Sequence, residues 1–368
     1  MVKRAAALLL VCASIAVWLS CGSTSSRYVF AALPTSSEIV IYREDPASGG
    51  LIQLVGSPVV AGPSVQSLAM HPTGKYLFAA NAGQNNISAY AISNGALTET
   101  QARTPAGTAP TLLAIDSAGA FLYCANAASF DISAYSININ QTNNTVTLTP
   151  VAQLSGATAP IGLSALNMAI AGNVLYVTGQ GTLGYIEAFP LNQGVLGAPL
   201  AGSPYQTGDF PYGLAISPNG TFLYTGNKTS PGSISEFTIG SGGVLTQFAN
   251  SPIGETYSSP VSLAIDKSGN YLYAANQGNG NLIGYSIGAA SSSSPGSLTL
   301  LSTSPFLTGT QPNFVTNDPS GNYIFVGYGT SSSSLQSFAL ASGSGTLTSV
   351  AALGVTGSGP VTSIVVTP

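Results

Sequence analysis

The chain has 368 residues, of which 45% are hydrophobic and only 5% are charged, with a net charge of −4. Because so many apolar residues can bury a core, the 43 Gly and 23 Pro indicate turns between short strands and do not indicate disorder. No basic cluster is present, so nucleic acid is excluded as an expected partner.

Residues 1–20 have the pattern of an export signal, in which a basic start is followed by an apolar run that is short for a membrane span. Cys21 comes next and begins a small polar tether that ends at residue 26. This arrangement resembles a bacterial lipoprotein signal, in which the cysteine is lipidated. We expect an exported lipoprotein, anchored to the membrane through its lipid, in the outer membrane or the periplasm. Ordinary secretion and an uncleaved anchor are the alternatives.

The rest of the chain, residues 27–368, repeats a segment of about 49 residues. The clearest copies are 65–92, 211–239 and 260–287, and looser copies start near Pro110, Pro160 and Pro312. Each copy contains an apolar strand, a turn, an aromatic strand, a polar loop, a third strand and a fourth strand ending near Ser-Pro. Four strands at this period are typical of a β-propeller blade, which must stack on its neighbours to bury its faces.

The two ends of the repeat region complement each other. Residues 27–32 align with the second strand of a repeat, at 75–80, so the first strand of that repeat is missing. Residues 360–366 have the pattern of the missing strand. The sequence therefore predicts an all-β, seven-bladed propeller of four-stranded antiparallel blades. Its ring is closed by pairing the C-terminal strand into the N-terminal blade, which removes exposed sheet edges.

Several polar residues fall at positions where a structural role is expected. His71 and three aspartates lie in the turn after a first strand, where such side chains cap turn amides. Four asparagines end second strands and are expected to satisfy loop amides, and Cys124 replaces a small buried residue. One histidine in the chain gives no multi-histidine metal site, so we expect no metal and no cofactor. The aspartates and asparagines are Asp116, Asp266 and Asp318, and Asn81, Asn126, Asn227 and Asn276.

A binding site is predicted on the face that carries the connections between blades and the loops from second to third strands. Two of these connections, 203–213 and 251–260, are rich in Tyr, and each brings one carboxylate toward the axis. Asp209 and Glu255 could face each other across one pocket, and they are the candidate catalytic carboxylates. Ordinary solvated loops are the alternative. The predicted ligand-binding residues are Arg103, Tyr205, Asp209, Tyr212, Lys228, Glu255 and Tyr257.

The repeat at 62–92 resembles the seven-bladed lactonase family, whose named activity is 6-phosphogluconolactone hydrolysis, and the related YVTN-type repeat propellers. The resemblance extends over residues 27–368 and implies the same fold. It also implies Arg-His just before Leu-Ala and Glu just after the Asn that ends the second strand. This chain has Gln66-Ser67 and Ala82 at those places. The resemblance therefore predicts the fold more directly than the activity.

Three functions follow from these observations. The leading hypothesis is a monomeric propeller that binds a glycan, a peptide or an envelope protein and lacks the catalytic residues of the family. The second is a lactone hydrolase, a carboxylic-ester hydrolase in which Asp209 or Glu255 is the base and Tyr212, Arg103 or Lys228 stabilises the oxyanion. The third is a structural or adhesion component of the cell envelope.

Overall fold

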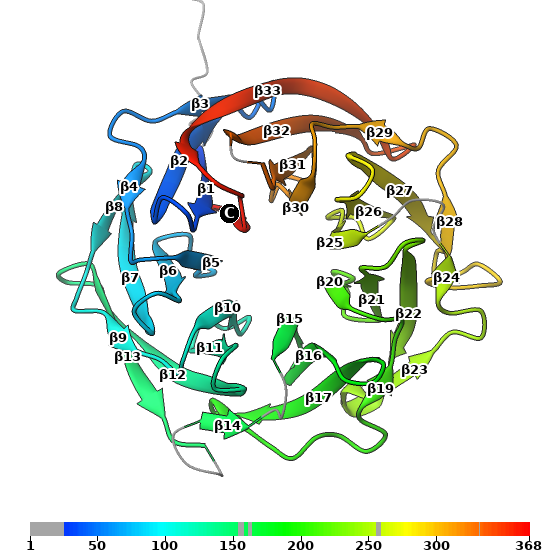
Figure 1. Ribbon diagram of the computed structural model, residues 1–368, viewed down its shortest axis with the longest axis horizontal. Helices are drawn as coiled ribbons and strands as arrows, with labels where there is room; N and C mark the ends of the chain where they lie inside the picture. Colours follow the sequence, from blue (N-terminus) through cyan, green and yellow to red (C-terminus); the bar gives the residue numbers. More distant parts are fainter. Residues whose placement is uncertain (1–25, 154–157, 161–163, 255–258, 331) are drawn as a thin grey trace, which may run out of the picture.

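The computed structural model arranges seven β-sheets around one axis, as Figure 1 shows. It describes residues 26–153, 158–160, 164–254, 259–330 and 332–368. The prediction of an all-β, seven-bladed propeller is confirmed. The export signal, Cys21 and all of the tether except its last residue lie outside the described residues, as do Glu255 and Tyr257. Within the described ranges, no helix is long and apolar enough to cross a membrane.

Each blade runs outward from the axis through four antiparallel strands, apart from short extra pieces at the rim. The inner strands are β34 (Ser363–Val366), β5 (Val65–Met70), β10 (Pro110–Ile115), β15 (Ala165–Ala171), β20 (Pro211–Ile216), β25 (Pro260–Ile265) and β30 (Pro312–Asn317). The second strands are β1 (Arg27–Leu33), β6 (Tyr76–Asn81), β11 (Phe121–Asn126), β16 (Val174–Gln180), β21 (Phe222–Asn227), β26 (Tyr271–Asn276) and β31 (Tyr323–Tyr328).

The outer half of each blade is less regular. The third strands are β2 (Glu38–Glu44), β7 (Asn86–Ser93), β12 (Asp131–Asn140), β17 (Gly184–Asn192), β22 (Ser233–Ile239), β27 (Asn281–Ile287) and β32 (Ser332–Ala341). The outer strands are β3 (Leu51–Gln53), β8 (Ala96–Glu99), β13 (Thr145–Val151), β18 (Val195–Leu196), β23 (Leu245–Gln247), β28 (Leu298–Leu300) and β33 (Thr346–Ser358). A single 3₁₀ turn, Ser241–Gly243, precedes β23 in the described chain.

Six of the seven sheets carry a fifth, short strand that the sequence did not predict. It pairs with the third strand beyond the end of the outer strand. In four blades a proline lies between the outer strand and this short strand. Because proline has no amide hydrogen to donate to the ladder, pairing along the outer edge of the sheet stops there and resumes after it. The short strands are β4 (Val59–Val60), β9 (Thr104–Pro105), β14 (Thr158–Pro160), β19 (Tyr205–Gln206), β24 (Ile253–Gly254) and β29 (Phe306–Leu307).

One repeat boundary differs from its prediction. The copy expected to start near Pro160 begins its inner strand at Ala165, and Pro160 belongs instead to β14, which pairs with β12 of the preceding blade. The blades are numbered 1 to 7 in the order of the second strands β1, β6, β11, β16, β21, β26 and β31.

The hydrophobic core lies between blades. The described residues form seven clusters of buried apolar side chains, and each cluster is built from two neighbouring sheets. The aromatic second strands supply several of the largest side chains, such as Phe30, Phe78 and Tyr224, which are completely buried. Because each face is covered only by its neighbour, one blade cannot bury its own core.

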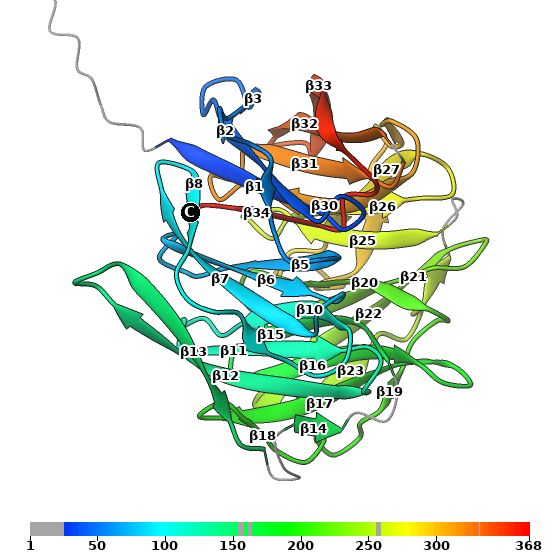
Figure 2. The ribbon, with the colours of Figure 1, turned by 60° about the vertical axis from the view of Figure 1, so that its left-hand side comes forward.

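Ring closure follows the predicted arrangement. Strand β34 pairs antiparallel with β1, so that Phe30 lies opposite Val365 and Ala31 opposite Ile364. Figure 2 shows the red β34 beside the blue β1. The Tyr28 amide also donates to Thr367 Oγ1 at 2.9 Å. Blade 1 is therefore complete only when both ends of the chain contribute to it.

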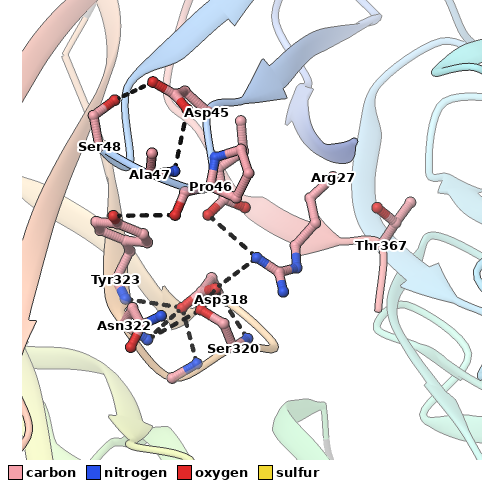
Figure 3. Close-up of polar contacts among 12 residues, drawn as sticks. Arg27, Asp45, Pro46, Ala47, Ser48, Asp318, Ser320, Asn322, Tyr323 and Thr367 are labelled. Carbon is pink, nitrogen blue, oxygen red and sulfur yellow. Dashed lines mark hydrogen bonds and ion pairs between the residues drawn. The ribbon is translucent and has the colours of Figure 1, made fainter. Parts of the chain in front are cut away.

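A buried charged cluster lies beside this closure, where blades 1 and 7 meet (Figure 3). Arg27 Nη1 lies 3.5 Å from Asp318 Oδ2 and 3.9 Å from Glu44 Oε1. Asp318 accepts backbone hydrogen bonds from its own turn, including those of Asn322 and Tyr323. Glu44 is only 1% exposed, and neither of its oxygens has a hydrogen-bond partner. Burial, with the nearby Asp318 carboxylate, raises the pKa of Glu44 from 4.5 to about 7, although Arg27 opposes the shift.

The polar residues predicted to be structural are mostly confirmed. Asp116 accepts the amides of Ala120 and Phe121, and Asp266 and Asp318 make equivalent turns. His71 is 4% exposed and contacts Thr73 Oγ1 and the Gly119 carbonyl through its ring nitrogens. Cys124 is buried.

The asparagines that end the second strands bind differently from the prediction. The Asn126 amide donates to Asp131 and Ser133 of the third strand, and Asn81 and Asn227 donate in the same way, so their partners are side chains and not loop amides. Asn276 is the exception, because Ile283 stands where the other blades have serine. A glycine packs on the amide: a Cβ at Gly62 would lie 2.2 Å from the Asn81 side chain. The Gly and Asn of the repeat motif therefore stabilise the blade.

Candidate functional site

Six of the inner strands contain a β-bulge near their first residue. In β20, for example, Pro211 pairs with Asn227 and Gly213 with Gly226, which leaves Tyr212 out of the ladder. A bulge re-aims the side chain that it releases. The six released residues, Gln66, Thr111, Leu166, Tyr212, Val261 and Asn313, all line the central channel.

The channel holds a cavity of about 530 Å³, lined by the inner strands of all seven blades. This volume is in the range of small-molecule sites. Its lining is mixed: Gln66, Asn313 and Thr362 are polar, whereas Leu166 and Val261 are apolar, so the two sides of the ring differ in character.

Most polar groups of this lining are occupied in holding the blades together. Ser67 Oγ accepts a hydrogen bond of 3.2 Å from the Leu113 amide, which belongs to the next blade. Ser262 and Ser363 accept equivalent hydrogen bonds of 3.1 Å. The side-chain amides of Asn167 and Asn313 donate to carbonyls of the following blade, at 2.6 and 2.8 Å. These groups stabilise the ring, and fewer donors and acceptors are left for a ligand.

Lys228 is the one charged side chain among the described residues that line the cavity. It follows β21, and its backbone amide donates to the Phe210 carbonyl. Its Nζ lies 4.9 Å from the centroid of the Tyr212 ring, within cation–π range. No ion pair formed by the described part of the chain includes Lys228. The cavity therefore contains one positive charge without a carboxylate partner in the described chain.

Of the predicted site residues, the structure brings together Tyr212 and Lys228. Asp209 is exposed in the connection between β19 and β20 and does not line the cavity. Arg103 lies at the outer part of blade 2, where it pairs with Glu99 at 2.9 Å and bonds to Gln84.

Tyr205 also lies away from the axis. It belongs to β19, which pairs with the third strand of blade 4, and its hydroxyl donates to the Ala201 carbonyl at 3.1 Å. Glu255 and Tyr257 are outside the described residues, so the proposed facing pair of Asp209 and Glu255 stays a prediction. The roles of these residues in binding or catalysis also stay predictions.

The sequence analysis did not identify the bulge residues as a ring. The bulge residues could have been recognised by their position, because each is the second residue of its inner strand. They are Gln66, Thr111, Leu166, Tyr212, Val261 and Asn313. The resemblance implies Arg-His where this chain has Gln66-Ser67, and both of these residues line the channel. The substitutions noted there therefore change the lining of the cavity itself.

A second hollow of about 530 Å³ opens between blades 6 and 7. Its described lining is Ser259, Gln277, Gly278, Asn279, Gly280, Thr310 and Gln311, all uncharged. Across the described chain, no cluster of His, Cys, Asp and Glu could hold a metal ion.

The fold and the channel define a closed seven-bladed propeller with an axial cavity. Residues 64–161, 199–299 and 263–364 match the family described as Lactonase, 7-bladed beta-propeller. The chain belongs to this family. No curated protein sequence is similar enough to be matched to it.

Solved structures with the same fold cover nearly the whole chain. A putative 6-phosphogluconolactonase from Bacteroides uniformis is 18% identical, with a TM-score of 0.73, and covers 93% of this chain and 99% of its own. A putative 6-phosphogluconolactonase from Bacteroides fragilis is 18% identical, with a TM-score of 0.69 and coverage of 94% and 99%. The periplasmic gluconolactonase PpgL of Pseudomonas aeruginosa is 18% identical, with a TM-score of 0.66 and the same coverage. At this identity the likeness shows the fold alone.

Proposed function

We propose that this lactonase-family propeller is a binding module for a small ligand, and that its site is the central channel. The observation that carries the proposal is the ring of bulge residues around a cavity of about 530 Å³. A bulge interrupts pairing and therefore costs ladder hydrogen bonds. Its repetition in six blades, always at the channel, supports a binding role for the side chains that it releases.

The alternative is hydrolysis of a lactone, as the names of the structural relatives suggest. Ring opening needs a base for the attacking water and a donor for the oxyanion. Lys228 could stabilise the oxyanion, but the described residues of the cavity lining include no carboxylate and no histidine to act as the base. Asp209 is exposed outside that lining. This geometry favours binding over hydrolysis.

Filling the channel tests the proposal. We expect Leu166→Trp to weaken binding of channel ligands at least tenfold, because the indole would occupy part of the cavity. Binding is measured by saturation-transfer NMR with a panel of glucose, gluconate, glucono-δ-lactone, 3-phenylpropionate and 3-phenylpropionamide. The matched control is Leu183→Trp in the same blade, at a site that is 50% exposed and outside the cavity.

Two results would overturn the binding proposal. One is that no member of the panel binds in a way that Leu166→Trp impairs and Leu183→Trp does not. The other is that the purified protein opens 6-phosphogluconolactone or glucono-δ-lactone far above the buffer rate and loses this activity in Asp209→Asn. The second result would establish the hydrolase.

We further propose that the module is displayed outside the cytoplasm on a lipid attached to Cys21. The support is the sequence of residues 1–26, with its apolar run, its cysteine and its polar tether. In a bacterial host fed radioactive palmitate, the wild-type protein should be labelled and fractionate with membranes, whereas Cys21→Ala should be unlabelled. Equal labelling of both proteins, or none of either, would contradict lipidation at this residue.

A further inference from the structure

We propose that the channel ligand is a small carboxylate with an apolar body, held by an ion pair to Lys228. This inference rests on the proposed function of the channel as the binding site. It concerns the chemistry of the ligand, and three features of the lining support it.

The first feature is that most of the polar side chains of the lining already bind an adjacent blade, although Thr111 Oγ1 has no hydrogen-bond partner. Ser67, Ser262 and Ser363 accept amides from adjacent blades, and Asn167 and Asn313 donate to carbonyls of adjacent blades. Thr362 Oγ1 donates to the Gln66 carbonyl at 2.7 Å. A ligand that needed many hydrogen bonds, such as a neutral sugar, would compete with the bonds that join the blades. Its unpaired hydroxyls would be costly against the apolar part of the lining.

The second feature is the positive charge of Lys228. The ammonium lies near the Tyr212 ring, and none of the ion pairs among the described residues uses it. The neighbouring blades present Leu166 and Met168 on one side and Val261 on the other. Such apolar surroundings lower the local dielectric and strengthen attraction to an anion. A carboxylate is therefore the group that gains most by entering this part of the channel.

The third feature is the apolar surface available to the rest of the ligand. Leu112 and Phe314 replace the serine that stands at the same inner-strand position in blades 2 and 6. Both residues line the cavity, as do Leu166 and Val261. Transfer of an apolar body from water onto these side chains is favourable in proportion to the area buried. Charge and apolar contact together select an aryl or alkyl carboxylate over a polyhydroxylated acid.

The test compares probes that differ in one property. By isothermal titration calorimetry, 3-phenylpropionate should bind at least tenfold more tightly than 3-phenylpropionamide, which has the same shape without the charge. It should also bind more tightly than gluconate, which has the charge without the apolar body. The preference for the anion should weaken as salt is raised, since screening reduces the ion pair.

Variants of the lysine test the contact itself. Lys228→Met should lower the affinity for 3-phenylpropionate at least tenfold and leave the affinity for the amide unchanged, whereas Lys228→Arg should retain most of the preference for the anion. The matched control is Lys75→Met, at an exposed lysine just before β6 and outside the cavity. Thermal melting of each variant shows whether it is folded.

The outcomes separate this inference from the proposed function. If the amide or glucose binds as tightly as the carboxylate, and Leu166→Trp abolishes that binding, the channel is a binding site and the inference is wrong. The inference is also wrong if Lys228→Met binds 3-phenylpropionate as the wild type does, or if gluconate binds more tightly than 3-phenylpropionate. If no probe binds in a way that Leu166→Trp impairs, both the inference and the proposed function fail.

Discussion

Replacing Ile364 with aspartate should lower the free energy of unfolding by about 4 kcal/mol or more, or prevent folding altogether. Ile364 is 2% exposed in β34 and packs in the cluster shared by blades 1 and 7. The substitution removes an apolar side chain from this core and places an unpaired carboxylate there, and both changes destabilise the folded ring. Thermal and denaturant unfolding, monitored by far-UV circular dichroism, measure the decrease in the free energy of unfolding.

The matched control is Ile52→Asp, the same substitution in β3 of the same blade, where Ile52 is 54% exposed. It should cost about 1 kcal/mol or less, because surface substitutions have small effects. If Ile364→Asp is as stable as Ile52→Asp, the pairing of β34 with β1 does not hold the ring closed.

The second large effect is on the pH dependence of stability. The pKa of Glu44 is about 7 in the folded protein and 4.5 as its ordinary value, so between these values the folded state holds a proton that the unfolded chain has lost. This contribution is fully present below pH 4.5 and is lost as the pH rises through 7. Stability should fall over this window by about 2–3 kcal/mol, since one pKa unit corresponds to about 1.4 kcal/mol.

Glu44→Gln should remove this part of the profile, because an amide is neutral at every pH. The variant should be more stable than the wild type at pH 8 and differ less from it near pH 4.5. The comparison uses the difference between the two proteins, since burial also raises the pKa of Glu236 and adds a slope of the same sign. Urea unfolding at intervals from pH 4.5 to 8 gives both profiles.

A second variant checks the cause. Arg27 lowers the pKa of Glu44, so Arg27→Met should move the loss of stability to higher pH. A difference profile between Glu44→Gln and the wild type that is flat with pH would show that Glu44 does not titrate in this window.

The closed ring could be predicted because it depends on patterns that survive in a single sequence. Residues 27–32 align with 75–80 without a gap, and residues 360–366 have the pattern of the first strand that is missing before them. The order of the strands therefore follows from the repeat. Turn residues such as Asp116 were predictable for the same reason, since their chemistry is local.

The site was harder to predict because it depends on irregularities. The short strands β9 and β19 pair with third strands, so Arg103 and Tyr205, which lie beside or in them, are held at the rim and not near the axis. The bulge that releases Tyr212 into the channel has no local marker in the alternation of the strand. Lys228 and Tyr212 were predicted together because the residue after a second strand and the start of the adjacent inner strand meet at one face.

The composition of blade 1 has a consequence for biosynthesis. Tyr28 and Thr367, which bond to each other, are 339 positions apart, so a nascent chain cannot finish this blade until β34 and Thr367 have emerged from the ribosome. Until then the apolar edge of β1 stays available to chaperones, proteases and other unfinished copies. A premature stop just before β34 would therefore yield a polypeptide that contains the other strands of the ring and yet is open to degradation.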